Sequence, residues 1–196
     1  CMGAGLNIAQ GVEKVEPDTT CFAFVGDSTF FASAITGVVN AVYNQANMVL
    51  VVLDNSTTAM TGHQPHPGTG RTVMGEIVQK INIEQVLRGI GVTEIETINP
   101  LELEASVSCV KRMAEKSGVR AIIFKAPCIA VTRPKAPLHV DQDSCIGCKK
   151  CIRDLGCPAI VMNDGKICID ASMCTGCHLC SQVCPVCAIA GGDDHE

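Results

Sequence analysis

The sequence predicts two domains: an α/β domain with a parallel β-sheet over residues 1–134, and a small cysteine-rich α+β domain over residues 135–196. Apolar runs that alternate with helical segments predict the first domain. Cysteine usage predicts the second, since ten of the 14 cysteines lie between Cys145 and Cys187. The proline-flanked stretch Pro134–Pro137 is typical of a linker between the two domains.

Three short apolar runs predict the strands of the sheet. They are Cys21–Val25, Asn47–Leu53 and Arg120–Phe124. The second run is continuously apolar, as expected for a strand that is buried on both faces. The helix-length segments between these runs are Ala32–Gln45, Ile83–Ile90 and Leu101–Ser117. Strands that alternate with helices indicate parallel pairing through right-handed crossovers.

The composition and the two ends of the chain limit the kinds of partner and cellular location that we expect. Of the 196 residues, 47% are hydrophobic, and the formal charge of -5 disfavours nucleic acid as a partner. We find neither a run of 18 apolar residues nor a leader sequence, and expect a cytoplasmic protein without a membrane span. The opening at Cys1 shows no start of a helix or strand, which suggests a fragment of a longer polypeptide. The acidic end, Asp193–Glu196, is expected to be solvated.

Cysteine spacing indicates the chemistry of the second domain. Cys174, Cys177, Cys180 and Cys184, with Pro185 directly after, form the run that holds iron–sulfur clusters in bacterial ferredoxins. The lack of a secretory signal disfavours disulfides. Zinc ribbons usually pair two CxxC knuckles and do not need a third cysteine three residues on. We therefore expect a ferredoxin-type domain with two [4Fe–4S] clusters.

A second cysteine run lies upstream, with two extra residues before Cys157 that should lengthen the turn there. In such paired runs the fourth cysteine serves the other cluster. The predicted ligands are Cys145, Cys148, Cys151 and Cys184 for one cluster, and Cys174, Cys177, Cys180 and Cys157 for the other. The remaining cysteines are expected to be packing residues, namely Cys21, Cys109, Cys128, Cys168 and Cys187.

A hairpin is predicted between the two cysteine runs. Ala159–Met162 and Lys166–Ile169 flank Asn163-Asp164-Gly165, a strong turn signal. Two cysteine loops joined by a short hairpin predict a pseudo-twofold module of about 60 residues, which is too small to fold on apolar burial alone. The clusters are therefore expected to stabilise it.

Polar side chains follow two of the predicted strands directly. Gly26-Asp27-Ser28 follows the first strand and Asp54-Asn55 follows the second. In a parallel sheet both emerge at the carboxyl edge, where open α/β sheets bind ligands. Carboxylate and amide oxygens suit Mg²⁺, with diphosphate oxygens completing its shell. Gly26 lets the backbone approach a phosphate, and a helix that starts near Phe31 would offer its N-terminus to the anion.

These motifs resemble the GDG…NN motif of thiamine diphosphate enzymes, with Asp27 and Asn55 28 residues apart. Ser28 replaces the usual glycine and Asp54 replaces the first asparagine. The segments 2–11 (MGAGLNIAQG) and 57–68 (TTAMTGHQPHPG) also resemble this family. Together with the two-cluster domain, they make the chain similar to the C-terminal part of the alpha subunits of indolepyruvate:ferredoxin oxidoreductases, which belong to the thiamine diphosphate-dependent 2-oxoacid:ferredoxin oxidoreductases.

The resemblance implies the site residues. The Mg²⁺ ligands would be Asp27, Asn55 and a main-chain carbonyl near Thr57, and the catalytic residues His63 and Gln64. For His63 and His66, contact with cofactor or substrate competes with ordinary loop hydrogen bonding. For Phe30 and Phe31, lining a substrate pocket competes with core packing. The implied cofactor-binding residues are Gly3, Gly26, Asp27, Ser28, Asn55, Thr57 and Gly62.

The implied activity is the oxidative decarboxylation of an aryl 2-oxoacid to its acyl-coenzyme A (EC 1.2.7 class), with electrons passing through the clusters to ferredoxin. The implied partners are the 2-oxoacid, coenzyme A, ferredoxin, a beta subunit and N-terminal domains, without which we expect no activity. Oxygen-sensitive clusters point to an anaerobe. Two alternatives stay open: an electron-transfer module whose α/β part only docks, and a non-oxidative thiamine decarboxylase with structural clusters.

Overall fold

The computed structural model describes residues 1–191, so the acidic segment Asp193–Glu196 lies outside the described residues. The chain forms two compact units, Cys1–Cys128 and Ile129–Glu196. The first is the α/β part and the second is the cysteine-rich module, for which the sequence predicted a boundary at residues 134 and 135. Among the helices of residues 1–191, none has the length and apolar character needed to cross a membrane.

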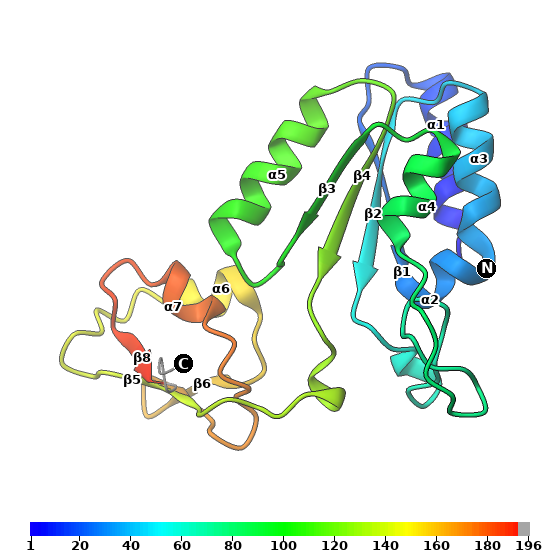
Figure 1. Ribbon diagram of the computed structural model, residues 1–196. Helices are drawn as coiled ribbons and strands as arrows, with labels where there is room; N and C mark the ends of the chain where they lie inside the picture. The colour runs from blue at the N-terminus through cyan, green and yellow to red at the C-terminus, as the bar shows by residue number, and fades with distance from the viewer. Residues whose placement is uncertain (192–196) are drawn as a thin grey trace. The chain divides into compact units, whose positions relative to one another are not determined.

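A four-stranded parallel sheet forms the centre of the first unit (Figure 1). Its strand order is β1-β2-β4-β3. The strands are β1 (Cys21–Gly26), β2 (Met48–Asp54), β3 (Glu94–Ile98) and β4 (Val119–Lys125). Residues 48–52 of β2 are all buried, which explains its unbroken apolar sequence. The predicted parallel α/β fold is confirmed.

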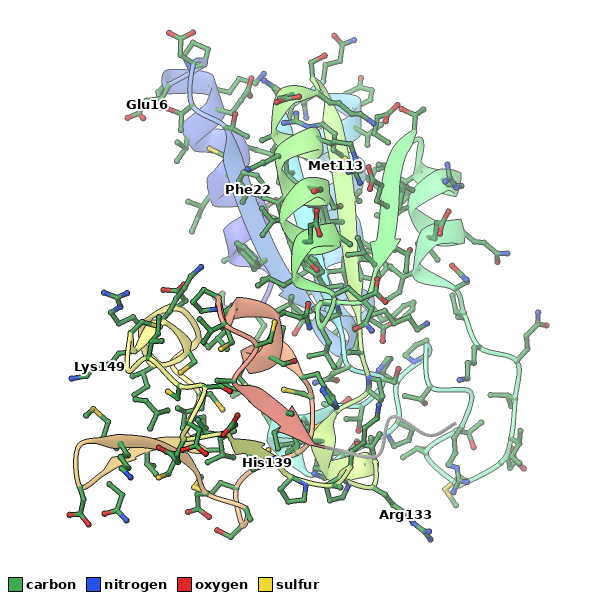
Figure 2. The ribbon with its side chains drawn as sticks, turned by 90° about the vertical axis from the view of Figure 1, so that its left-hand side faces the viewer. Glu16, Phe22, Met113, Arg133, His139 and Lys149 are labelled. Atoms are coloured by element: carbon green, nitrogen blue, oxygen red, sulfur yellow. The ribbon has the colours of Figure 1, made fainter. Side chains whose placement is uncertain are left out.

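Helices cover both faces of this sheet. On one face α1 (Ala4–Val15), α3 (Ile35–Tyr43) and α4 (Ile83–Ile90) pack against the sheet residues Ala23, Leu50 and Ala121. On the other face, which is turned to the viewer in Figure 2, α5 (Leu103–Glu115) packs Cys109 and Met113 against Val49 and Ile122. The buried sheet residues thus face one of two apolar cores, and the polar loops are left at the sheet's carboxyl edge.

Two elements of this unit were not predicted. The opening does contain a helix, α1, although its N-cap residue is Gly3, which has no side chain to cap it. The prediction that the opening lacks a helical start is therefore wrong. Strand β3 was also missed, because its sequence EIETI is interrupted by charge and it is an edge strand.

The helix that follows β1 begins four residues earlier than predicted. Helical conformation starts at Asp27 in α2 (Asp27–Thr29), not near Phe31. It continues through a π-helical turn, η1 (Phe30–Ala34), into α3. Single π-turns inside helices are frequent at functional sites. The early start puts Asp27 itself in the first helical turn, at the end of β1.

The cysteine-rich module contains two small antiparallel sheets. One pairs β5 (Leu138–Val140) with β8 (Ile189–Gly191), and the other is the predicted hairpin of β6 (Ile160–Asn163) and β7 (Lys166–Ile169). The hairpin turn uses Asp164 and Gly165, both with positive φ, as a two-residue turn of this kind requires. This fold of the module is confirmed.

Each cysteine loop of the module leads into a short helix. These helices are α6 (Lys150–Leu155) and α7 (Leu179–Val183). The two extra residues before Cys157 make α6 longer and add Gly156, which ends the helix in the left-handed conformation. A short η3 turn (Ile129–Val131) opens the module.

Candidate functional site

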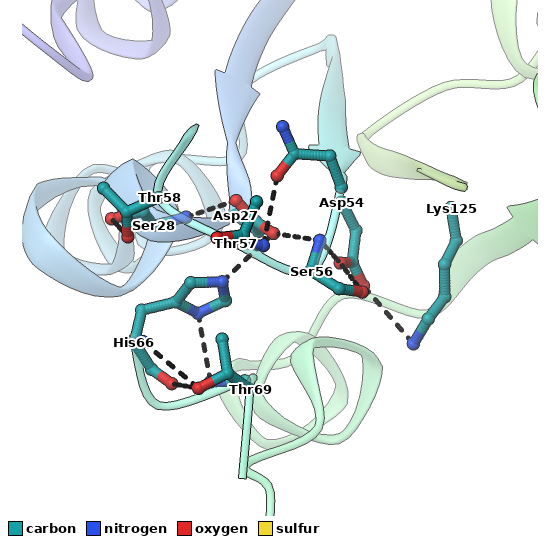
Figure 3. A network of polar contacts seen from close by, with 11 residues as sticks. Asp27, Ser28, Asp54, Ser56, Thr57, Thr58, His66, Thr69 and Lys125 are labelled. Atoms are coloured by element: carbon teal, nitrogen blue, oxygen red, sulfur yellow. Dashed lines mark hydrogen bonds and ion pairs between the residues drawn. The ribbon is translucent and has the colours of Figure 1, made fainter. Parts of the chain in front are cut away.

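The two strand-end motifs meet at the carboxyl edge of the sheet, as Figure 3 shows. Asp27 follows β1, and Asn55 follows the neighbouring strand β2. The two strands are parallel and in register, with Gly26 opposite Leu53, so the next residues of both leave the sheet on the same side. This is the edge at which open α/β sheets bind ligands.

Asp27 is the buried centre of this edge. The residue is only 2% exposed, and its Oδ1 accepts a hydrogen bond of 2.7 Å from the Ser28 N–H. Its Oδ2 accepts one of 2.8 Å from the Ser56 N–H, which ties the two strand ends together. Burial raises the pKa of Asp27, although the Ser28 N–H and the nearby His66 oppose the rise. A carboxylate this deeply buried is stabilised when a cation binds it.

His66 lies against the same carboxylate. Its Nε2 is 3.1 Å from Asp27 Oδ2, and the imidazole is almost fully buried. Its Nδ1 accepts a hydrogen bond from the Gly68 N–H at 3.1 Å, which leaves Nε2 as the nitrogen that carries the proton of the neutral ring. The ring stacks on Phe31, with 5.8 Å between centroids. Phe31 therefore faces the site, whereas Phe30 is fully buried in the core.

A second ring of polar contacts surrounds this centre. Asp54 Oδ1 accepts hydrogen bonds from the N–H of Ser56 at 3.0 Å and from its hydroxyl at 3.2 Å. Asp54 Oδ2 is 3.3 Å from Lys125 Nζ, at the end of β4. The Thr58 hydroxyl donates to the Ser28 hydroxyl at 3.0 Å. Polar contacts thus join the end of β2 and the loop after it to α2 and to the end of β4.

Several predicted cofactor-binding residues gather here. Asn55 Oδ1 accepts a hydrogen bond of 3.2 Å from the N–H of Thr57, which is itself buried. Nothing lies within 4 Å of where a Cβ of Gly26 would stand, so the strand end is open to an approaching group. Gly3 lies apart from these contacts, at the start of α1, where a Cβ would collide with the Ser33 hydroxyl.

The two predicted catalytic residues do not join this network. His63 and Gln64 are both exposed, in the loop that follows the short η2 turn (Ala59–Thr61). The Gln64 amide is bonded to the side chain and carbonyl of Thr61, in the same loop. Gly62 adopts φ +112, which turns the loop there. The histidine that reaches Asp27 is His66, and its only local sequence signal is its place between two prolines, Pro65 and Pro67.

The residues at this edge fit a magnesium–diphosphate group. The predicted donor set would consist of hard oxygens from Asp27, Asn55 and a main-chain carbonyl near Thr57, which would suit Mg²⁺. The buried carboxylate favours a bound cation, and the open space beside Gly26 admits a phosphate.

The module brings its cysteines together around two cavities. Cys145, Cys148, Cys151 and Cys184 line one of them. Cys157, Cys174, Cys177 and Cys180 line the other. In each cavity, one cysteine comes from the opposite run, which is the crossover that the spacing predicts.

The electrostatics of the thiols agree with this grouping. Burial, and then the neighbouring Cys177, Cys174 and Cys157, raise the pKa of Cys180 to about 11. Burial also raises the pKa of Cys151, with Cys148 and Cys184 adding to the rise. Sulfurs this close repel one another as thiolates, so a bound metal group would stabilise the charged set.

The cysteine spacing suits an iron–sulfur cluster better than a single zinc ion. In both runs a third cysteine follows the CxxC pair three residues later, which zinc ribbons do not need and ferredoxin-type cluster loops do. The Ala188 N–H also donates to Cys184 Sγ at 3.2 Å, the kind of contact that orients a cluster ligand.

The spare cysteines differ from one another. Cys109 is fully buried in the core, as predicted. Cys21 packs at the edge of the other core, and Cys168 is half-buried in β7. Cys187 is exposed and has a positive φ, so the prediction that it is a packing residue is wrong. It follows Val186 in a turn at the surface rather than in a strand or helix.

Comparison with known proteins places the chain in a family. Residues 1–124 match the family described as "Thiamine pyrophosphate enzyme, C-terminal TPP binding domain". The chain belongs to the thiamine pyrophosphate enzymes. Residues 138–185 match a second description, "4Fe-4S dicluster domain". A thiamine pyrophosphate-binding domain and an iron–sulfur domain are therefore joined in one polypeptide.

Curated relatives of this thiamine pyrophosphate enzyme are named indolepyruvate oxidoreductase subunit IorA, which confirms the predicted resemblance. The protein from Methanothermobacter thermautotrophicus is 46% identical over 85% of the chain, and that from Methanothermobacter marburgensis is 44% identical over 96%. The chain spans 27% and 31% of these relatives' lengths. A 2-oxoglutarate:ferredoxin oxidoreductase from Magnetococcus marinus shares the fold, with a TM-score of 0.58 at 19% identity over 64% of this chain and 45% of that one.

Proposed function

We propose that this chain is the diphosphate-binding and electron-carrying part of a 2-oxoacid:ferredoxin oxidoreductase that acts in the cytoplasm. The substrate is an aryl 2-oxoacid of the indolepyruvate type, which is converted to its acyl-coenzyme A. The observation that carries this proposal is the presence, in one polypeptide, of a Mg²⁺-type oxygen site at the edge of a thiamine pyrophosphate-binding sheet and of two four-cysteine cavities. The names of the relatives support the choice of substrate.

At the sheet edge, the chain's own residues hold the cofactor's charged end. Asp27, Asn55 and a main-chain carbonyl near Thr57 would hold Mg²⁺, which would supply positive charge to the diphosphate. Gly26 leaves room for the phosphate, and His66 holds the Asp27 oxygen that does not accept from the Ser28 N–H. Thiamine diphosphate, when bound, supplies the electron sink that makes loss of CO₂ from a 2-oxoacid possible. The predicted catalytic His63 and Gln64 stand in an exposed loop, where they are available to substrate or to another domain.

The number of electrons released in the reaction supports the role proposed for the cysteine-rich module. Converting a 2-oxoacid and coenzyme A to an acyl-coenzyme A and CO₂ releases two electrons. A [4Fe–4S] cluster carries one electron at a time at low potential. Two clusters, one held by each set of four cysteines, would therefore match one turnover. Each cluster would supply one-electron transfer to ferredoxin, which would be reduced as the cluster is oxidised.

A cofactor measurement on the complete enzyme complex tests this proposal. We expect the anaerobically purified complex to contain thiamine diphosphate, Mg²⁺ and iron, and to reduce viologen dye only when both indolepyruvate and coenzyme A are present. Asp27→Asn, which keeps the shape of the side chain, should weaken Mg²⁺-dependent thiamine diphosphate binding by about 100-fold or more. Asp18→Asn, at an exposed position of the α1–β1 turn, is the matched control.

The alternatives predict different results. A complex that contains iron but no thiamine diphosphate would be an electron-transfer module only. Release of an aldehyde without dye reduction would indicate non-oxidative decarboxylation. A wild-type level of thiamine diphosphate binding in a folded Asp27→Asn protein would remove Asp27 from the metal site. Thermal unfolding of both variants shows whether each is folded.

A further inference from the structure

The two cysteine loops of the module have the same backbone but different surfaces. Gly147 and Gly176 have φ of 65° and 67°, and Lys149 and His178 have φ of 60° and 61°. In each loop, the first cysteine's N–H donates to an aspartate carbonyl four residues earlier, at 3.0 Å. Because the backbones repeat, any difference between the loops lies in their side chains and in what covers them.

Charge is the first difference. The segment from Cys145 to Arg153 carries three cations and no carboxylate, since Lys149, Lys150 and Arg153 are all basic and exposed. The equivalent segment from Cys174 to Gln182 has no Lys, Arg, Asp or Glu. The nearest carboxylates in sequence, Asp143 and Asp154, flank the basic segment on either side. Lys149 stands at the periphery of the module in Figure 2.

Exposure is the second difference. Around the first cavity, Ile146 is 65% exposed and Cys148 is also exposed. Around the second cavity, Gly176 is buried and Cys177 is half-buried. The cover of the second loop comes from the module's own linker. The Lys135 N–H donates to the Thr175 carbonyl at 3.2 Å, and a Cβ on Gly176 would meet the Ala136 carbonyl oxygen at 2.7 Å.

We propose that the loop of Cys145–Arg153 is the docking surface for the external electron acceptor, an acidic iron–sulfur protein. This inference rests on the proposed function and adds to it the place where electrons leave. The three cations attract an acidic partner, and the exposed Ile146 and Cys148 bring it close to the first cavity. The linker closes the equivalent approach to the second loop. Each transfer moves one electron: the cluster of the first cavity is oxidised and the partner's cluster is reduced.

Charge removal in the complete complex tests the docking surface. Lys149→Gln and Lys150→Gln are combined in one variant. The control combines Lys111→Gln and Lys166→Gln, two exposed lysines outside the loop, so that the net charge changes equally. The binding of a purified acidic two-cluster ferredoxin to the immobilised complex is measured by surface plasmon resonance, at 20 mM and 200 mM salt. The rate of ferredoxin reduction is measured in parallel and divided by the rate of viologen reduction.

At low salt, we expect the Lys149/Lys150 variant to bind ferredoxin about ten-fold more weakly, and the ratio of the two rates to fall by a similar factor at low ferredoxin. The control should stay within about two-fold of wild type, and salt should shrink the difference between the variants, because it screens the charges. Equal ferredoxin affinity in both variants would overturn the docking surface. Failure of the wild-type complex to reduce dye with any 2-oxoacid would instead remove the proposed function, and the binding measurement would still decide the docking site.

Discussion

Different interactions stabilise the α/β unit and the cysteine-rich module. In the α/β unit, two apolar cores lie on either side of a four-stranded sheet, with strands of up to seven residues and a helix of 13. In the module, the strands have three or four residues and the helices five or six. Its buried apolar residues are few, and the thiols of two cavities stand among them. Apolar burial is therefore the main expected source of stability in the first unit, whereas the second is expected to need bound clusters.

The largest effect that we expect is on removal of iron, which should unfold the module and leave the α/β unit folded. Without clusters, the eight thiols of the two cavities are left without the bonds that close its loops. After chelation under anaerobic conditions, trypsin should cut rapidly at Lys149, Lys150 and Arg153, while residues 1–128 stay resistant. Mass spectrometry of the fragments identifies the cuts. Equal resistance of both units after complete iron loss would show that the module has a sufficient core of its own.

Loss of one crossover cysteine should remove the cluster of one cavity and leave the cluster of the other in place. Cys184→Ala removes a thiol from the first cavity, although the residue lies in the second cysteine run. We expect the iron content to fall from about eight to about four per chain, since each [4Fe–4S] cluster holds four. Iron analysis and electron paramagnetic resonance measure the change.

The matched control for this cysteine is Cys187→Ala, three residues later, where the side chain is exposed and lines neither cavity. Its iron content should stay at the wild-type level. Retention of both clusters in Cys184→Ala would contradict the crossover, and loss of both would show that the two clusters depend on each other for folding.

The smallest effect that we expect concerns the rate at which a single buried cysteine of the α/β unit is labelled. Burial, and then Glu96, raise the pKa of Cys109 to about 11, so only roughly a thousandth of it is thiolate at pH 8. Iodoacetamide at pH 8 should label Cys109 at least about 100-fold more slowly than the exposed Cys1, before and after iron removal. Mass spectrometry gives both rates. Rapid labelling of Cys109 after chelation would mean that the α/β core also opens.

Strands that are buried on both faces were the most predictable part of the fold. Continuous apolar sequence marks β2, and it allowed the sheet and its direction to be predicted. The edge strand β3 gave no such signal, because Glu94 and Glu96 interrupt it. These two carboxylates pair with Lys116 and Arg112, which lie on or next to α5. Ion pairs between residues 16 and 22 positions apart cannot be recognised in a single sequence.

The site residues closest to the strand ends were the most predictable. Asp27 and Asn55 directly follow strands, so the parallel sheet places them on one edge. His66 comes to Asp27 from 39 residues away, through a loop whose closure depends on Phe31 and on the Thr69 hydroxyl, which donates to the His66 carbonyl. The exposure of His63 and the burial of His66, three residues apart, follow from this closure and not from local pattern.

The hydrogen bond from the Ser56 N–H to Asp27 has a consequence for affinity. It holds the loop after β2 against the start of α2 through the carboxylate that is proposed to bind the metal. These two segments are thus preorganised before any ion arrives, and little of the ion's binding free energy is spent on ordering them. A longer side chain at position 27, such as glutamate, would shift both the ion and the hydrogen bond to the Ser56 N–H. Metal binding and the local structure therefore depend on the same two carboxylate oxygens.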